Sequence, residues 1–283
     1  MKLVVARREA GQQPAKVVVV PDPHVRPNQS VARFRALARL VIQERPTHMV
    51  WLGDLLDMPS LSRHNGAKSR GGEGPNARHG CRTARQDINA GLEALRAFEE
   101  VISKWNARQS RSGRHDKIVR FVRVFCVGNH EMMIEESGVE MAEWVEDINF
   151  EEMFGRHLKK MGYHVIPFLE CAVINGVYFS HYFKSGAMGK PVQIGNAIRQ
   201  IGRSAVWGHS HTVGYAERMS PAGWDKYLCC GTFMDEYTLQ HHHGASSGIV
   251  ILDDVLDGDF THSFVSLRRL LAVEKPSIMD RAA

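Results

Sequence analysis

The sequence predicts an α/β protein that contains at least one parallel pair of strands. A β-branched run at 16–20 is followed by an amphipathic helical pattern at about 30–44 and a second apolar run at 48–52. A helix between two buried strands is typical of a β-α-β unit, whose strands are parallel. Several later strand-like runs also end in polar residues, which places chemistry at the strand ends.

The first strand and helix have clear boundaries. The strand from Lys16 to Val20 ends in a Pro-Asp-Pro-His turn, which the two prolines make rigid. Asp22 and His24 point the same way if the chain there is extended. Ser30 is expected to cap the helix, which ends near Glu44.

The second strand, His48 to Leu52, runs into Gly53-Asp54 and, three residues later, Asp57. An Asp after a strand is, by itself, more often a turn former or a helix cap than a ligand. Open α/β sheets nevertheless bind their ligands at the carboxyl ends of strands. The surrounding motifs therefore decide the role of Asp54.

A long polar stretch from 58 to 87 follows, with Glu73 as its one acid before Asp87 and with basic side chains at Arg63, Lys68, Arg70, Arg78, Arg82 and Arg85. It is either a solvated loop or a basic segment that meets substrate phosphates. An amphipathic helix is expected at about 88–105. Together with a basic turn at 108–117, these segments form a predicted insertion at about 60–115.

The remaining chain alternates between strand and helix patterns. Strands are expected at 118–127, 163–167, 172–174, 177–180 and 204–207, and helices at about 139–148, 151–161 and 192–201. Asn175-Gly176 predicts a tight hairpin between two of these strands. The last part predicts an antiparallel region with strands at 227–230, 248–252 and 260–265.

Five strand-like runs end in residues that can bind metals: Asp22 and His24, Asp54, Asn129 and His130, His181, and His209 and His211. Taken singly, each has an ordinary explanation, such as a turn histidine or an exposed polar position. Together they are too many for one closed tetrahedral site, and mixed carboxylate, imidazole and amide ligands suit hard-to-borderline divalent ions. The set predicts two ions that share a bridging carboxylate and a bridging water.

In order, Asp22-x-His24, Gly53-Asp54-x-x-Asp57, Gly128-Asn129-His130-Glu131, His181 and Gly208-His209-x-His211 resemble the signature of the calcineurin-like metallophosphoesterases. The similarity runs from residue 17 to about 212. It implies a four-layer αββα sandwich of two mixed β-sheets flanked by helices, with a di-metal site at the strand ends. The layout is most similar to the phage or prophage branch of that family.

The resemblance also implies a role for each residue. Asp22, His24 and His211 would bind the first ion, Asn129, His181 and His209 the second, and Asp54 would bridge them. His130 would be the acid that faces the substrate, oriented by the Asp57 carboxylate. The implied cofactors are two divalent ions, with Mn favoured and Fe, Zn, Ni or Co accepted by the same ligands.

Departures from the family pattern narrow the substrate class. Ser/Thr protein phosphatases of this family carry arginines where this chain has Met58 and Val127, so that activity is disfavoured. Cyclic-nucleotide phosphodiesterases and double-strand-break nucleases of the superfamily usually have Asp where this chain has Glu131. A triplet at His241–His243 is either a surface turn or a contact near the active site.

Length, composition and net charge are those of an ordinary globular protein. The 283 residues fit a single metallophosphoesterase domain over 1–283, with 43% hydrophobic and 24% charged residues. No run is long enough to span a membrane, and the short apolar start predicts no signal peptide. Five scattered cysteines predict a reducing, cytoplasmic location. The net charge of +5 is compatible with a phosphate-bearing partner.

The sequence therefore predicts hydrolysis of phosphoester bonds by a metal-bridging hydroxide. A phosphodiesterase or nuclease acting on DNA, RNA or nucleotides is favoured, because Arg63, Arg70, Arg78 and Arg82 lie in the basic segment. A phosphomonoesterase is the first alternative. A non-catalytic binding scaffold on the same fold is the second, although such scaffolds have usually lost ligands that are all present here.

Overall fold

The computed structural model describes residues 4–5, 13–61, 83–141, 149–186, 189–220, 223–240 and 244–272. The first sheet of this part contains β1 (Val4–Val5), β6 (Ala172–Ile174), β7 (Val177–Ser180), β10 (Ala205–Trp207), β12 (Gly223–Cys230) and β11 (Val213–Ser220), in that order. The second sheet contains β14 (Asp259–Ser266), β13 (Gly248–Leu256), β2 (Ala15–Val20), β3 (His48–Trp51), β4 (Val122–Cys126) and β5 (Tyr163–Ile166).

Both sheets are mixed. In the second sheet β2, β3, β4 and β5 are parallel, whereas β13 runs antiparallel to β2 and to β14. In the first sheet β7, β10 and β12 are parallel, whereas β6 and β11 are antiparallel to their neighbours β7 and β12. A small ribbon of β8 (Lys184–Ser185) and β9 (Lys190–Pro191) lies outside them.

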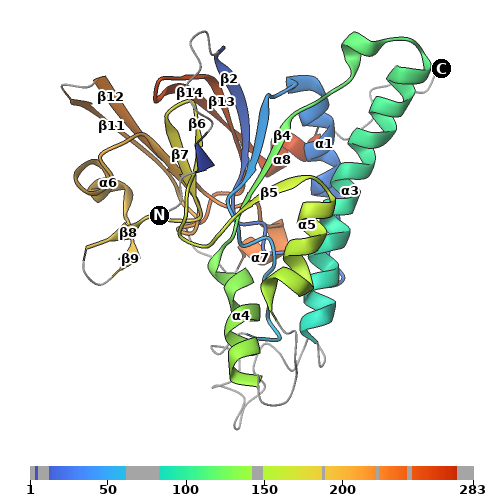
Figure 1. Ribbon diagram of the computed structural model, residues 1–283, viewed down its shortest axis with the longest axis horizontal. Coiled ribbons are helices and arrows are strands. Elements are labelled where there is room, and N and C mark those ends of the chain that lie inside the picture. Colours follow the sequence, from blue (N-terminus) through green and yellow to red (C-terminus); the bar gives the residue numbers. More distant parts are fainter. Residues whose placement is uncertain are drawn as a thin grey trace.

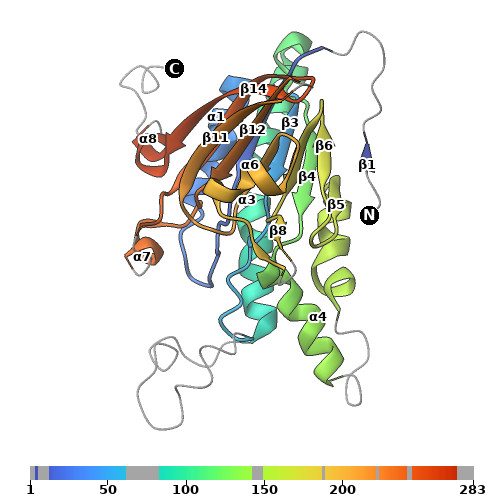
Figure 2. The same ribbon diagram turned by 90° about the vertical axis from the view of Figure 1, so that its left-hand side faces the viewer.

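The helices and helical turns are α1 (Ala32–Glu44), α3 (Ala84–Arg111), a 3-10 turn (His115–Lys117), α4 (Asn129–Met141), a π-helical turn (Glu151–Gly155), α5 (Arg156–Lys160), α6 (Ile194–Gln200), α7 (Glu236–Leu239) and α8 (Leu267–Ala272). Figure 1 shows α1, α3, α5 and α8 on one side of the two sheets and α6 on the other. Figure 2 shows α6 in front of β11 and β12.

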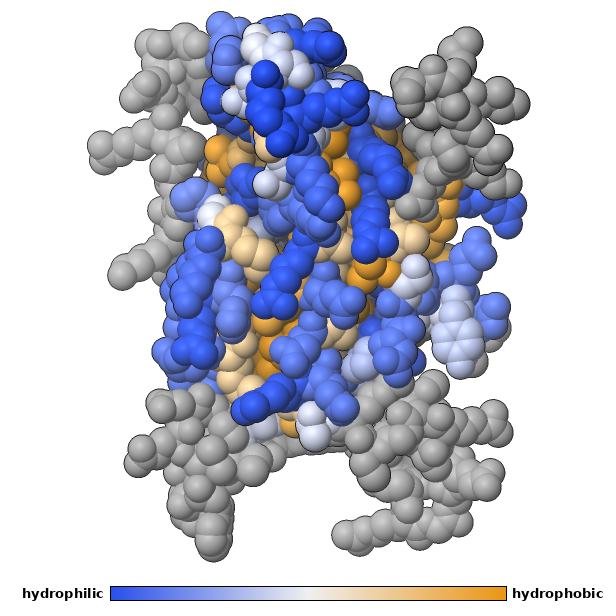
Figure 3. Space-filling model, turned by 90° about the vertical axis from the view of Figure 1, so that its right-hand side faces the viewer, coloured by the Kyte–Doolittle hydropathy of each residue, from blue (hydrophilic) through white to orange (hydrophobic). Residues whose placement is uncertain are grey.

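Side-chain alternation along the strands builds four layers. Val18 and Val20 of β2 join the core beneath α1 and α3, while Val17 and Val19 point into the space between the sheets. In the other sheet Val206 of β10 packs into that same space, and its neighbours on the strand pack against α6. The expected αββα sandwich of two mixed sheets is therefore confirmed. The outer surface of the layer that contains α3 is mostly hydrophilic (Figure 3).

Most predicted elements are present with shifted bounds. Thr83 begins α3 with a capping box to Gln86, so this helix is longer than the apolar pattern at 88–105 indicated. The helix predicted at 139–148 overlaps the end of α4, which begins much earlier, at Asn129, directly in the Gly-Asn-His-Glu motif. Residues 142–148 lie outside the described part.

The C-terminal antiparallel region was predicted only in part. β12 belongs to the first sheet and β13 and β14 to the second, so the region is divided between the two sheets. The predicted strands also omitted β11, whose sequence mixes glycine and charged residues with apolar ones. Among the described residues, no helix is both long enough and apolar enough to cross a membrane.

Candidate metal centre

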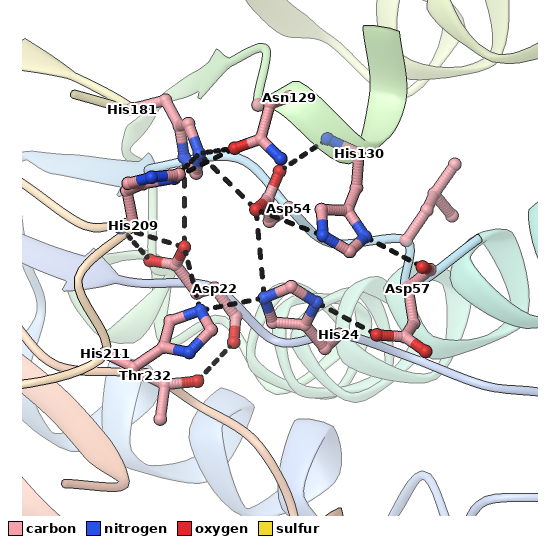
Figure 4. A network of polar contacts seen from close by, with 12 residues as sticks. Asp22, His24, Asp54, Asp57, Asn129, His130, His181, His209, His211 and Thr232 are labelled. Atoms are coloured by element: carbon pink, nitrogen blue, oxygen red, sulfur yellow. Dashed lines mark hydrogen bonds and ion pairs between the residues drawn. The ribbon is translucent and has the colours of Figure 1, made fainter. Parts of the chain in front are cut away.

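The candidate site lies where the parallel strands of both sheets end. β2 leads to Asp22 and His24, β3 to Asp54, β4 to Asn129, β7 to His181, and β10 to His209 and His211. Figure 4 shows these side chains pointing toward one another from separate loops. The structure thus brings together all seven residues that the sequence predicted as metal ligands.

One group of donor atoms forms around Asn129. Its Oδ1 lies 2.8 Å from His181 Nε2 and 2.9 Å from His209 Nδ1, and the two ring nitrogens are 3.2 Å apart. Asp54 Oδ2 lies 3.4 Å from His181 Nε2. Four donor atoms therefore face one small volume.

A second group forms around His24 and His211. Their Nε2 atoms are 3.1 Å apart, and His24 Nε2 lies 3.7 Å from Asp54 Oδ2. Asp22 Oδ1 lies 3.8 Å from His211 Nε2. Asp54 Oδ2 is common to both groups, which is the position that a bridging carboxylate needs.

The donor spacing fits divalent ions. Two ligand atoms held about 2.1 Å from one ion, at angles between octahedral and tetrahedral, lie about 3.0–3.4 Å apart. The two imidazole pairs, at 3.1 and 3.2 Å, match that spacing. Oxygen and imidazole donors in this mixture suit Mn, Fe, Zn, Ni or Co.

Burial sets the charge of the ligands. It lowers the pKa of His209 to about 4 and also lowers that of His24, so both rings are neutral and keep a lone pair for an ion. Burial raises the pKa of Asp22 well above its usual value. Burial acts in the same direction on Asp54, but His181 and His130 outweigh it and hold the pKa of Asp54 well below the usual range.

His181 is the exception among the imidazoles. Burial opposes its protonation, yet the carboxylates of Asp54 and Asp22 and the backbone oxygen of Leu52 raise its pKa to about 9. Its Nδ1 lies 2.7 Å from that oxygen, so Nδ1–H donates there and Nε2 faces the candidate ion. Nε2 must lose its proton before it can bind a metal.

We therefore expect Mn²⁺ binding to the metal-free protein to release a proton at pH 7.5. The apparent affinity should rise with pH up to about 9, the pKa of His181, because fewer ligands must then be deprotonated. Calorimetric titrations in buffers of different ionisation enthalpy measure this release. A binding heat that is independent of the buffer would contradict the protonated state of His181.

The loops that carry the ligands are held in a costly backbone conformation. Asp22, His24, Asp54, His209 and His211 all have φ between 43° and 63°. Non-glycine residues in the left-handed region cost about 1–3 kcal/mol each, and such residues cluster at functional sites. Surrounding contacts must therefore impose this geometry.

Several hydrogen bonds hold the Asp22 loop. Thr232 Oγ1 donates to the backbone oxygen of Asp22 at 2.6 Å, and the backbone N–H of Phe233 donates to the same oxygen at 3.2 Å. The Asp22 carboxylate accepts from the backbone N–H of His209 at 2.9 and 3.0 Å. Thr232 was not predicted as a site residue.

Glu131 joins two of the ligand loops. Its buried carboxylate accepts the backbone N–H groups of Asp54 at 2.8 Å, Leu56 at 3.0 Å and Gly128 at 2.9 Å. Burial and the nearby Asp54 carboxylate raise the pKa of Glu131 to about 7, although the N–H donors favour its ionised form. The sequence marked Glu131 only as a departure from a motif, whereas the structure gives it a supporting role.

Gly208 allows the closest approach in the site. A Cβ at this position would lie 2.0 Å from Asp22 Oδ2, so any side chain would displace that carboxylate. Gly128 has the same relation to Asp54, with Oδ1 at 2.2 Å. These contacts explain why glycine precedes Asn129 and His209.

Gly208→Ala should therefore lower Mn²⁺ affinity by about 10–100-fold, the usual cost of disturbing the surroundings of a metal ligand. Gly195→Ala in α6 is the matched control, because its Cβ would meet nothing within 4 Å. An alanine there should leave binding unchanged and gain up to about 1 kcal/mol of helix stability. Equal affinities in the two variants would show that Asp22 is not held against the Gly208 backbone.

His130 lies beside the ligands. Its backbone N–H donates to Asp54 Oδ1 at 2.9 Å, and its Nε2 lies 4.0 Å from Asp54 Oδ2. Burial lowers its pKa, but Asp54 and Asp57 outweigh this effect, and the net pKa is raised. The ring is therefore protonated more readily than a free histidine.

The contacts of Asp57 differ from those that the resemblance implied. His130 Nδ1 lies 2.7 Å from the backbone oxygen of Asp57, not from its carboxylate. The carboxylate instead contacts His24 Nδ1 at 3.1 Å and Arg26 Nε at 2.5 Å. The hydrogen bond between His130 and Asp57 is therefore accepted by the backbone oxygen, whereas the resemblance implied the carboxylate.

Some predicted residues cannot be placed. Arg63, Arg70, Arg78 and Arg82 lie outside the described residues, and so does the triplet His241–His243. Met58 and Val127, which stand where protein phosphatases have arginines, are both buried in the core, at 0% and 3% exposure. Neither position can present a polar group to a substrate.

Comparisons with known proteins add little. No family model matches the sequence, and no curated protein matches it. Among solved structures, a match is described as "Structural and biochemical characterization of Yfce, a phosphoesterase from E. coli". It has 14% sequence identity and a TM-score of 0.36, and the alignment covers 89% of this chain and 99% of that one. A likeness of this strength carries no functional argument, so the function must be inferred from the site.

Proposed function

We propose that this protein is a phosphoesterase that depends on two divalent metal ions. The observation that supports this most strongly is Asp54 Oδ2, which lies 3.4 Å from His181 Nε2 and 3.7 Å from His24 Nε2 and so faces both groups of donors. A mononuclear site has no use for a carboxylate shared in this way. Two ions about 3.5–4 Å apart are typical of enzymes that act on phosphoesters.

Under this proposal each ion has its own ligands. Asp22, His24 and His211 would hold the first, Asn129, His181 and His209 the second, and Asp54 both. When bound, such ions lower the pKa of water and neutralise the charge on phosphoryl oxygens. Mn²⁺ is the ion we favour, and Fe, Zn, Ni and Co are the alternatives that the same ligands accept.

The protein's own contribution is an acid for the leaving group. Nδ1 of His130 faces the Asp57 backbone oxygen, which leaves Nε2 on the side of Asp54. The Asp54 and Asp57 carboxylates outweigh the effect of burial and raise the pKa of this ring, which favours its protonated form. Nε2 can therefore hold the proton that a departing alkoxide requires.

The proposed substrates are phosphodiesters in nucleic acids or nucleotides. The basic composition of residues 58–87 supports this choice, and the buried Met58 and Val127 weigh against a protein phosphatase. Phosphomonoesters are the alternative. Relationship to the phage or prophage branch and a cytoplasmic location stay predictions from the sequence.

A screen of the Mn²⁺-loaded protein tests the proposal. It should hydrolyse bis-p-nitrophenyl phosphate faster than p-nitrophenyl phosphate, and EDTA should stop both reactions. Faster hydrolysis of the monoester would favour the alternative. Protein that binds Mn²⁺ but turns over no monoester, diester, cyclic nucleotide or DNA would favour a non-catalytic scaffold.

A further inference from the structure

A third group of potential metal ligands lies beside the two already described. Side-chain atoms of His24, Asp57 and His130 lie within 4.8 Å of one another. This group either holds a third cation or supports the residues of the other two sites. The contacts of Asp57 decide between these possibilities.

Both oxygens of the Asp57 carboxylate already have partners. Oδ1 lies 3.1 Å from His24 Nδ1, and Oδ2 accepts from Arg26 Nε at 2.5 Å. The guanidinium already supplies a positive charge at this carboxylate, so a further cation there would be repelled. His130 Nδ1 is also engaged, by the backbone oxygen of Asp57.

Arg26, Asp57 and His24 form a row of contacts that leads to the first ion site. His24 uses Nδ1 for Asp57, and its Nε2 lies 3.1 Å from His211 Nε2. A carboxylate at Nδ1 fixes the proton on that atom and leaves the lone pair on Nε2, where an ion needs it. It also makes the imidazole a stronger donor.

Backbone contacts hold this row in place. The loop after β2 and the loop after β3 are joined by bonds from His24 N to Asp54 O at 2.9 Å, Val25 N to Leu55 O at 2.7 Å, and Asp57 N to Val25 O at 3.2 Å. Asp57 is therefore fixed opposite His24 before any ion binds. The side chains are shielded, with 3% exposure for His24, 11% for Asp57 and 26% for Arg26.

We propose that Arg26 and Asp57 are positioning residues that set the affinity of the first metal site by orienting His24. Arg26 acts through Asp57: it holds the carboxylate in the rotamer that meets Nδ1. The inference rests on the proposed function, because it assumes an ion at His24. In this inference the Asp57 carboxylate orients His24, which is a candidate metal ligand. The Asp57 backbone oxygen, and not the carboxylate, orients His130.

Calorimetric Mn²⁺ titration of the metal-free protein tests this. In Asp57→Asn we expect one of the two ions to bind about 10–100-fold more weakly, as is usual when the partner of a ligand is removed. The other ion should keep its affinity. Arg26→Gln should weaken the same ion by less, and the double variant should match Asp57→Asn alone, since Arg26 acts only through Asp57.

Arg123→Gln is the matched control. Arg123 pairs with Glu99 at 2.8 Å, with side-chain exposures of 23% and 19%, in a comparable half-buried ion pair that involves no residue of the site. This variant should bind both ions as the unaltered protein does.

A second measurement separates the two roles for Asp57. At saturating Mn²⁺, Asp57→Asn should keep the steep dependence of kcat on leaving-group pKa, because the Asp57 backbone oxygen that holds His130 Nδ1 is still present in the variant. If kcat in Asp57→Asn instead depended on leaving-group pKa as it does in His130→Gln, the inference would be overturned. The Asp57 carboxylate would then orient His130, as the resemblance implied.

The remaining outcomes are also decisive. Unchanged Mn²⁺ binding in Asp57→Asn, or equal weakening of both ions, would overturn this inference alone. A third bound ion that disappears in Asp57→Asn would show that the group is itself a metal site. Unaltered protein that binds no Mn²⁺ would overturn the proposed function together with this inference.

Discussion

Asp54→Asn should reduce kcat/KM for bis-p-nitrophenyl phosphate by about 10³-fold or more. The substitution keeps the shape of the side chain but removes the charge that faces both groups of imidazoles, 3.4 and 3.7 Å away. Metal ions contribute several kcal/mol of charge stabilisation to such reactions. A loss of about 4 kcal/mol corresponds to about 10³ in rate.

Thermal melts distinguish this loss from misfolding. Mn²⁺ at 100 times its dissociation constant should stabilise the unaltered protein by about 2.7 kcal/mol for each site. Asp54→Asn should unfold cooperatively and gain much less from the same Mn²⁺. A variant that keeps the activity and the metal-dependent stabilisation of the unaltered protein would show that Asp54 is not shared between two ions.

His130→Gln should produce a loss that depends on the leaving group. For substrates with alkoxide leaving groups, such as a dinucleotide, we expect kcat to fall by about 10²–10⁴-fold, the usual contribution of a general acid. For p-nitrophenyl esters the loss should be small, since nitrophenolate departs without a proton.

Paired kinetics on the two substrate types measure this effect. Glutamine is a suitable replacement because its amide can still donate to the Asp57 backbone oxygen, which His130 Nδ1 contacts at 2.7 Å. Equal losses on both substrate types would mean that His130 orients the substrate or a ligand and does not supply the proton.

Local patterns in the sequence predicted the strands, but not how the two sheets are assembled. Successive side chains of the runs at 16–20 and 48–52 pack into two different apolar cores, so both runs are apolar after their first residue. Such a run, bounded by turn residues, is enough to identify a buried strand. The αββα layers were implied by the resemblance of motifs. β11 was missed because Gly214, Glu217 and Arg218 interrupt its pattern, and pairing with β12 overrides that weak propensity.

The candidate metal ligands could be selected from the sequence because histidine, aspartate and asparagine recur at the ends of its strand-like runs. Their supporting residues could not, because the partners are distant along the chain. Glu131 is 77 residues from Asp54, and Thr232 is 210 residues from Asp22. For Asp57 the sequence could not show that its carboxylate faces His24, since His24 and His130 are both within reach and only the loop geometry separates them.

The number of Mn²⁺ ions bound to each chain tests the central claim most directly. Metal-free protein titrated with Mn²⁺, with elemental analysis of the saturated sample, should bind two ions per chain in the unaltered protein. Asp54→Asn should lose high-affinity binding of both ions, because the shared carboxylate serves each site. A single ion per chain at saturation, or none, would contradict a two-metal phosphoesterase.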